Sequence, residues 1–204
     1  FLRRIKKRLV QRQGIYTSKK YSSIYFPINK VACTSIGDVL KRKGFERKNC
    51  NNISINNYKN RFTFIRNPYD RLVSAYKDKI EMPAESGVIA ENPDKLYPGM
   101  SFKNFVRAVY SISDERADKH FKSQNSFLTD KEKRLIPDTI GKFENLEKDY
   151  KKIMKKIGIK KPPKLPHKRK SKRKKNYLEY YDEEIKKLVQ ERYKKDFELF
   201  GYEF

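Results

Sequence analysis

The sequence predicts an α/β fold in which a central parallel sheet is flanked by helices. Short apolar, β-prone segments alternate with amphipathic helical segments along the 204 residues. This alternation is typical of parallel strands joined by helical crossovers. Two of the predicted strands end in segments rich in anion-binding residues. Because ligands of such sheets bind beyond the carboxyl ends of the strands, we expect both segments to contribute to one site.

The first predicted strand covers about residues 22–28 and leads through a turn into a helix at 34–43. The turn combines a lysine with small and hydroxyl-bearing residues: Lys30, Val31, Ala32, Cys33, Thr34 and Ser35. Free N–H groups and the positive end of the helix dipole make a helix N-terminus a site for phosphate-like anions. We therefore predict that this turn binds an anion through the Lys30 ammonium and backbone N–H groups.

The second anion-binding segment follows a predicted strand at 61–66 and begins a helix at 68–80. Asn67-Pro68 ends the strand, and proline suits the first turn of a helix. Arg66 lies at the strand end, and Ser74 lies eight positions later on the helix. Arginine forms bidentate hydrogen bonds to phosphate, and a serine hydroxyl can add another. Together with the first turn, this segment predicts a nucleotide site.

The remaining elements follow from apolar periodicity and from turn residues. After a proline- and glycine-containing loop at 83–99, we predict helices at 101–112 and 114–122, a strand at 139–144, and helices at 145–157 and 178–199. A basic loop spans 158–176, and a basic segment at 1–21 precedes a single domain at 22–204.

The two anion-binding segments resemble the nucleotide motifs of sulfotransferases that use 3′-phosphoadenosine 5′-phosphosulfate (PAPS). The likeness is to the carbohydrate sulfotransferases of family 2, which include the chondroitin, dermatan and HNK-1 enzymes. Further similar stretches are His120–Gln124, Ile140–Glu147 and the closing run from Tyr193 to Tyr202. The resemblance covers about residues 22–204. It implies a P-loop-like sulfotransferase fold, PAPS as co-substrate, a carbohydrate acceptor and no metal.

The sequence also departs from the family pattern at three places. Ile28-Asn29 separates Pro27 from Lys30, where the family has proline directly before the lysine, and we expect this to alter only the approach to the turn. The family's His-Trp-x-Pro-Gln reads His120-Phe121-Lys122-Ser123-Gln124, and its His-x-Asn-x-Ser has Arg169 at the asparagine position. These two changes concern acceptor contacts.

The resemblance assigns Lys30, Val31, Ala32, Cys33, Thr34 and Ser35 to the 5′-phosphosulfate, and Arg66 and Ser74 to the 3′-phosphate. Sulfuryl transfer also needs charge neutralisation on the leaving phosphate, which Lys30 can supply, and a base for the acceptor hydroxyl. Histidine is the easiest base near neutral pH, which makes His120 a candidate, although it is equally readable as a structural histidine. Glu144 is the carboxylate alternative, and its other reading is support of the helix beginning at Asn145.

Residues 160–175 hold ten lysines and arginines and no acid. This stretch is either an irregular basic loop or a lid that closes on the 3′-phosphate or an acidic acceptor. Related enzymes carry a basic, hydroxyl-containing loop there, so Lys170, Ser171 and Lys172 are candidate cofactor-binding residues.

A formal net charge of +25 has two interpretations, a lysine-rich solvated surface or a surface that binds an anionic partner, and with the resemblance the second favours an anionic glycan. A nucleic-acid-binding protein is the alternative from another class, but it leaves the two anion-binding segments unexplained. The Gly-x-x-x-x-Gly-Lys-Ser/Thr signature of nucleotide kinases is missing from the sequence. A further alternative is a sulfotransferase that acts on a hydroxyl of a molecule other than a carbohydrate.

The chain has only two cysteines, Cys33 and Cys50, which indicates a reducing compartment. We therefore expect a cytoplasmic protein. Residues 1–12 are basic, with apolar residues on one helical face, and are too short and too charged to span a bilayer. They could associate with a membrane surface, or follow an upstream anchor that would place the enzyme in the Golgi lumen.

Overall fold

The computed structural model describes residues 14–50, 53–81, 92, 94–166 and 176–203. The chain divides into two compact units. Unit 1 comprises Phe1–Ile65 and Gln124–Arg169, and unit 2 comprises Arg66–Ser123 and Lys170–Phe204. Among the described residues, none of the helices combines the length and apolar character needed to cross a membrane.

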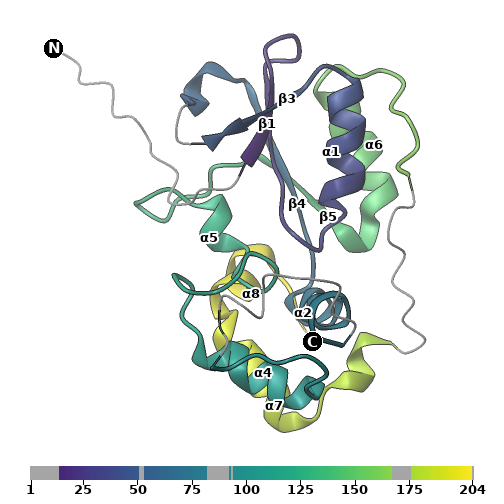
Figure 1. The fold of residues 1–204 in the computed structure, drawn as a ribbon. Helices are drawn as coiled ribbons and strands as arrows, with labels where there is room; N and C mark the ends of the chain where they lie inside the picture. Colours follow the sequence, from purple (N-terminus) through teal and green to yellow (C-terminus); the bar gives the residue numbers. More distant parts are fainter. Residues whose placement is uncertain (1–13, 51–52, 82–91, 93, 167–175, 204) are drawn as a thin grey trace, which may run out of the picture. The chain divides into compact units, whose positions relative to one another are not determined.

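Unit 1 is built on a five-stranded sheet with the order β3-β1-β2-β4-β5 (Figure 1). The strands are β1 (Gly14–Ser18), β2 (Ser23–Phe26), β3 (Glu46–Asn49), β4 (Asn60–Ile65) and β5 (Thr139–Lys142). β4 pairs in parallel with both β2 and β5, whereas β1 pairs antiparallel with β2 and with β3. Only β1 therefore runs against the others. The predicted α/β fold with a mainly parallel central sheet flanked by helices is confirmed.

Two of the five strands differ from the sequence prediction. β1 lies inside the stretch 1–21 that was assigned to an N-terminal segment, and a tight turn joins it to β2, with Ser22 N donating to Lys19 O at 3.1 Å. β3 carries exposed polar residues throughout, so it lacks the apolar alternation that marks a strand. β3 forms because its backbone pairs with β1. Its charged side chains discourage the addition of another strand at this edge of the sheet.

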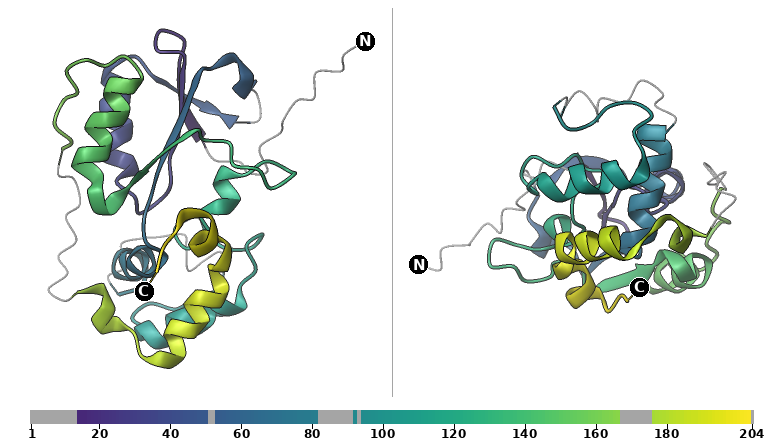
Figure 2. Two further views of the ribbon diagram at one scale, coloured as in Figure 1. Left: turned by 180° about the vertical axis from the view of Figure 1, so that it is seen from behind. Right: turned by 90° about the horizontal axis from the view of Figure 1, so that it is seen from below.

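The helices of unit 1 are α1 (Cys33–Arg42), α5 (Asn125–Leu128) and α6 (Leu146–Lys156), with single 3₁₀ turns at Ile55–Asn57 and Phe143–Asn145. α1 and α6 cover the same face of the sheet (Figures 1 and 2). A Cβ atom on Gly37 would lie 2.6 Å from the Tyr16 hydroxyl oxygen, so glycine permits α1 to approach β1 this closely. A Cβ atom on Gly141 of β5 would likewise lie 2.5 Å from the Phe64 ring of β4 and 3.1 Å from Ile153 of α6, so glycine permits this close packing.

Unit 2 is helical and packs around an aromatic core that includes Tyr69, Phe105 and Phe121. Its elements are α2 (Pro68–Tyr76), the π-helical turn Lys77–Glu81, α4 (Phe102–Ser111), the 3₁₀ turn Tyr177–Tyr180, α7 (Glu183–Arg192) and α8 (Lys194–Phe200).

The prediction of a helix at 114–122 is wrong, because this segment forms successive turns. Isolated helical hydrogen bonds occur, such as Lys122 N to Asp118 O, but the carbonyls of Lys119 and Lys122 accept from the Arg71 side chain instead of continuing a helical ladder. The helix predicted at 178–199 is broken in two places. Asp182 starts α7 by accepting from Ile185 N at 3.0 Å, and Tyr193 separates α7 from α8.

Candidate active site

The turn after β2 holds an unusual backbone in a fixed position. Lys30 and Ala32 both adopt the left-handed conformation, with φ of 69° and 51°, which is uncommon for residues other than glycine. Ile28 and Val31 are fully buried and anchor the turn, with Val31 N donating to Ile28 O at 3.3 Å. Because strained backbone of this kind concentrates at functional sites, the conformation points to a ligand-binding turn.

The turn leads into α1, whose N-terminus has no side-chain cap. The N-cap residue, Ala32, has no side chain that could accept from the first-turn N–H groups, and this turn contains no acidic residue. Each other described helix of eight or more residues has a side-chain cap or a first-turn acid. The N–H groups at the start of α1 therefore offer donors, together with the positive end of the dipole, to an anion.

Two hydroxyl groups support this turn from neighbouring segments of unit 1. The buried Thr63 Oγ1 donates to Phe26 O, the last carbonyl of β2, at 2.7 Å. Ser35 Oγ donates to Pro166 O at 2.8 Å. The hydroxyl of Ser35 is thus engaged with Pro166 of the basic loop, while Thr34 is exposed and the free thiol of Cys33 is half-buried. This contact ties the basic loop, at Pro166, to the anion-binding turn.

In unit 2, Arg66 is buried and held by Asp70. Both Arg66 Nε and Nη2 lie 2.8 Å from Asp70 Oδ2. Asp70 and Ser74 are one helical turn apart on α2, so the guanidinium of Arg66 and the half-buried Ser74 side chain lie on the same side of this helix. Asn67 caps α2 by accepting from Tyr69 N at 3.0 Å. The arrangement presents an oriented arginine and a serine on one surface, which suits an anion.

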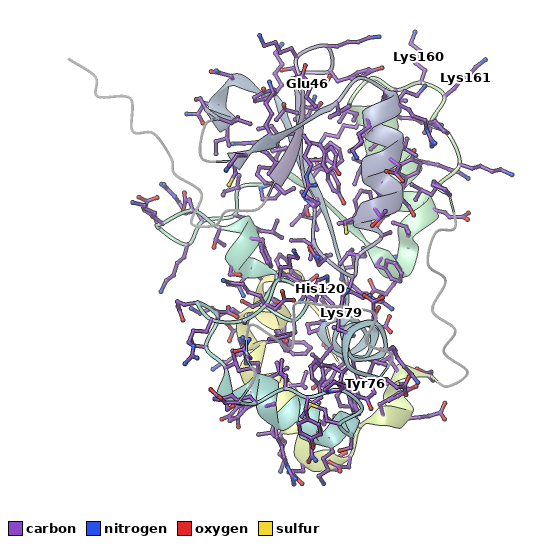
Figure 3. The ribbon with its side chains drawn as sticks, in the orientation of Figure 1. Glu46, Tyr76, Lys79, His120, Lys160 and Lys161 are labelled. Atoms are coloured by element: carbon purple, nitrogen blue, oxygen red, sulfur yellow. The ribbon has the colours of Figure 1, made fainter. Side chains whose placement is uncertain are left out.

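His120 lies on the segment that follows α4 and is labelled in Figure 3. Its Nδ1 is 2.6 Å from Asp118 Oδ1, and its backbone N–H donates to the same oxygen at 2.8 Å. Burial opposes ionisation of Asp118, but the hydrogen bonds and charge of His120 outweigh it and lower the pKa of this carboxyl. An ionised carboxylate only accepts, so the Nδ1–H group of His120 donates to Asp118, and in the tautomer that carries its single proton on Nδ1 the nitrogen able to accept a proton is Nε2.

Glu144 is exposed and follows the carboxyl end of β5 by two residues. Asp149 accepts from the Lys142 backbone N–H at 2.8 Å where the chain enters α6. The position of Glu144 next to a parallel strand end keeps it a candidate for contact with a ligand.

The predicted site residues are distributed over both units. Unit 1 contains Lys30 to Ser35 and Glu144, whereas unit 2 contains Arg66, Ser74 and His120. Lys170, Ser171 and Lys172 lie outside the described residues. Sequence reasoning missed Thr63 and Asp118. The Asp-x-His spacing could have pointed to Asp118, whereas Thr63 looks like any strand residue. Among the described residues, no group of three or more His, Cys, Asp or Glu side chains is placed to hold a metal ion.

Comparison with known proteins gives one result. A model of the family described as "Sulfotransferase family" matches residues 13–203, which is nearly the whole chain. No curated protein and no solved structure gives a significant match. The family match includes the turn after β2, the Arg66–Ser74 segment and His120.

Proposed function

The chain belongs to the sulfotransferase family, and from this premise we propose that it transfers the sulfuryl group of PAPS to a hydroxyl of an anionic carbohydrate. The observation that carries the proposal is the turn after β2. There, Lys30 and an uncapped helix N-terminus meet in a strained but well-anchored backbone. This combination suits the phosphosulfate end of the donor, because it offers several N–H donors and one ammonium group to the same anion.

The donor would bind through residues from both motifs. Lys30 and the backbone of Val31 to Ser35 would hold the 5′-phosphosulfate, and Arg66 and Ser74 would hold the 3′-phosphate. The Arg66–Asp70 pair supports the second role, since it fixes the guanidinium before the ligand arrives. As the sulfur–oxygen bond to the leaving phosphate breaks, negative charge grows on the bridging oxygen, and the Lys30 ammonium would stabilise it.

We assign the general base to His120, with Glu144 as the alternative. The carboxylate of Asp118 keeps the proton on Nδ1, so that Nε2 can take the proton of the attacking hydroxyl. Asp118 would also stabilise the imidazolium that forms. The assignment predicts that His120→Ala loses most of its turnover, with nucleotide affinity preserved.

An anionic glycan is the acceptor that fits the net charge of +25. The basic loop supports this choice. Lys170, Ser171 and Lys172 follow Pro166 in the sequence by four to six positions, and Pro166 O accepts a hydrogen bond from Ser35 Oγ of the anion-binding turn. We therefore assign these basic and hydroxyl-bearing residues to the donor's 3′-phosphate or to an acidic acceptor. Cys33 and Cys50 are not joined in a disulfide, which supports a reducing, cytoplasmic setting, with the Golgi lumen as the alternative.

Calorimetry with 3′-phosphoadenosine 5′-phosphate, the desulfated product, tests the donor assignment. We expect tight binding by the wild type and a severe loss in Arg66→Ala. The matched control is Arg107→Ala, because Arg107 is an exposed arginine whose partner is Glu184. Equal affinity of wild type and a folded Arg66→Ala variant would refute the assignment.

A screen with labelled PAPS over acidic polysaccharides, neutral glycans, phenols, tyrosine peptides and DNA fragments tests the acceptor. Transfer to an anionic saccharide that falls with added salt is the expected result, because salt screens the basic surface. Preferred transfer to a neutral phenol, insensitive to salt, would refute the glycan assignment and leave sulfuryl transfer standing. Tight DNA binding without nucleotide binding would favour the nucleic-acid alternative.

A further inference from the structure

The segment that carries His120 is held by side chains from distant parts of unit 2. Arg71 of α2 donates from Nη1 to Lys122 O at 2.7 Å and from Nη2 to Lys119 O at 3.2 Å. The hydroxyl of Tyr193, at the junction of α7 and α8, donates to Phe121 O. Three carbonyls next to His120 are therefore fixed by two side chains that are almost completely buried.

A second set of contacts fixes the end of the same segment. Ser123 donates to Asp114 from its backbone N at 3.1 Å and also from its hydroxyl. Arg192 Nη2 in turn donates to Asp114 Oδ1 at 2.7 Å. Phe121 packs edge-on against Phe105 of the core, with ring centroids 6.0 Å apart. The backbone from residue 118 to 123 is thus restrained at both ends and in its middle.

The burial of Arg71 calls for an explanation, because a charged group costs free energy when it leaves water. Only 2% of its surface is exposed, and burial lowers the pKa of its guanidinium, although Tyr193, Asp196 and Asp114 counteract this. An apolar side chain would fill the space at lower cost. What an arginine adds is a rigid fork of donors that fixes two carbonyls in one geometry.

Arg71 also links two functional regions. It lies on α2 between Asp70, which binds Arg66, and Ser74. Arg66 and Ser74 are the proposed contacts to the 3′-phosphate. Through its two hydrogen bonds, the same helix fixes the backbone on either side of His120. A movement of α2 would act on the backbone that carries His120 through these two hydrogen bonds.

We propose that Arg71 and Tyr193 are positioning residues that hold the His120 segment so that Nε2 faces the acceptor hydroxyl, and that α2 thereby couples donor binding to proton removal. This inference rests on the proposed role of His120 as the base. A displacement of about 1 Å at a reacting group can cost about 100-fold in rate. Loosening the segment should therefore reduce turnover far more than nucleotide affinity.

Tyr193→Phe is the sharpest variant, because it removes only the hydroxyl that binds Phe121 O and keeps the buried ring. Tyr110→Phe is its matched control, since it removes a tyrosine hydroxyl that binds Glu191 at the surface. We expect kcat to fall about tenfold in Tyr193→Phe and about 100-fold in Arg71→Met. The dissociation constant for 3′-phosphoadenosine 5′-phosphate should stay within about twofold, and Tyr110→Phe should resemble the wild type. If Arg71→Met does not fold, the kcat of Tyr193→Phe alone tests the positioning role.

A spectroscopic measurement tests the same idea without relying on activity. The chain has two histidines, so a His167→Gln background leaves His120 as the only imidazole. Long-range ¹H–¹⁵N correlation spectra at pH 8 should show the Nδ1–H tautomer in this background. With Tyr193→Phe added, the spectra should show a mixture with the Nε2–H tautomer, because the Asp118–His120 contact is no longer held in one geometry.

The outcomes separate the two proposals. If the wild type neither binds the nucleotide nor transfers sulfate, the proposed function fails, and the tautomer measurement still decides whether Tyr193 positions His120. If the wild type turns over, but Tyr193→Phe keeps its kcat within about twofold and its tautomer unchanged, the positioning role is refuted. It is also refuted if His120→Ala retains full turnover, or if Tyr110→Phe loses as much as Tyr193→Phe.

Discussion

Replacing Lys30 by glycine should separate the stability of the anion-binding turn from its chemistry. The left-handed conformation of Lys30, with φ of 69°, costs a residue with a Cβ atom about 1–2 kcal/mol. Glycine avoids this cost but loses about 0.5–1 kcal/mol through the greater entropy of its unfolded state. We therefore expect Lys30→Gly to be more stable than Lys30→Ala by about 1 kcal/mol, because alanine keeps the strain. Both variants lose the ammonium, so kcat should fall by about 100- to 1,000-fold.

Urea denaturation gives the two free energies of unfolding, and a PAPS turnover assay gives kcat. Ala32→Gly is the matched control, because Ala32 is also left-handed, with φ of 51°, but supplies no charge. It should gain stability and lose far less turnover than either Lys30 variant, because it keeps the Lys30 ammonium and the backbone N–H groups. A glycine variant at position 30 that is less stable than the alanine variant would refute the strain argument. A kcat within about twofold of wild type in both Lys30 variants would show that Lys30 is not the electrostatic catalyst.

Two further predictions concern the supports of the site. Thr63→Val keeps the side-chain shape but removes the hydrogen bond to Phe26 O. We expect the free energy of unfolding in urea to fall by about 1–2 kcal/mol and 3′-phosphoadenosine 5′-phosphate to bind more weakly. Unchanged values of both quantities would contradict a supporting role of Thr63. Burial opposes ionisation of Asp114, but Arg192 and Ser123 outweigh it and hold its pKa below the ordinary 3.8. The folded state therefore gains stability from Asp114 above about pH 4 and loses it as the pH falls further. Unfolding measured at pH 6 and pH 3 should show a smaller difference in Asp114→Asn than in the wild type, and an equal difference would contradict this linkage.

The parts of the fold that could be predicted are those with a local apolar signal. β2 and β4 each contain several buried aromatic and aliphatic residues, and each is followed by a clear helix start. β3 could not be predicted, because Glu46 to Asn49 are all exposed and become a strand only by pairing with β1. The turns at 114–122 were misread for a related reason. Hydrogen bonds from Arg71 and Tyr193 to its carbonyls determine the conformation of this backbone, and both residues are distant from it in sequence.

The candidate site divides in the same way. Residues that would touch the donor, such as Lys30 and Arg66, stand in recognisable motifs, because anion binding demands particular residue types next to strand ends. The residues that orient them carry no such mark. Thr63 is one more β-branched strand residue, and its value depends on Phe26 O lying 2.7 Å away across the parallel pairing of β2 and β4.

A chain with 50 basic residues still places buried carboxylates beside two of its candidate site residues. Asp70 binds Arg66, and Asp118 binds His120, although each carboxylate reduces the local positive charge available to an anionic substrate. Attraction alone would favour uncharged neighbours at these positions. A long basic side chain or an imidazole that can rotate must be ordered when the substrate binds, and this ordering costs free energy in every catalytic cycle. The paired carboxylates meet that cost during folding. We infer that long-range attraction comes from the many exposed lysines and arginines, whereas Asp70 and Asp118 supply orientation.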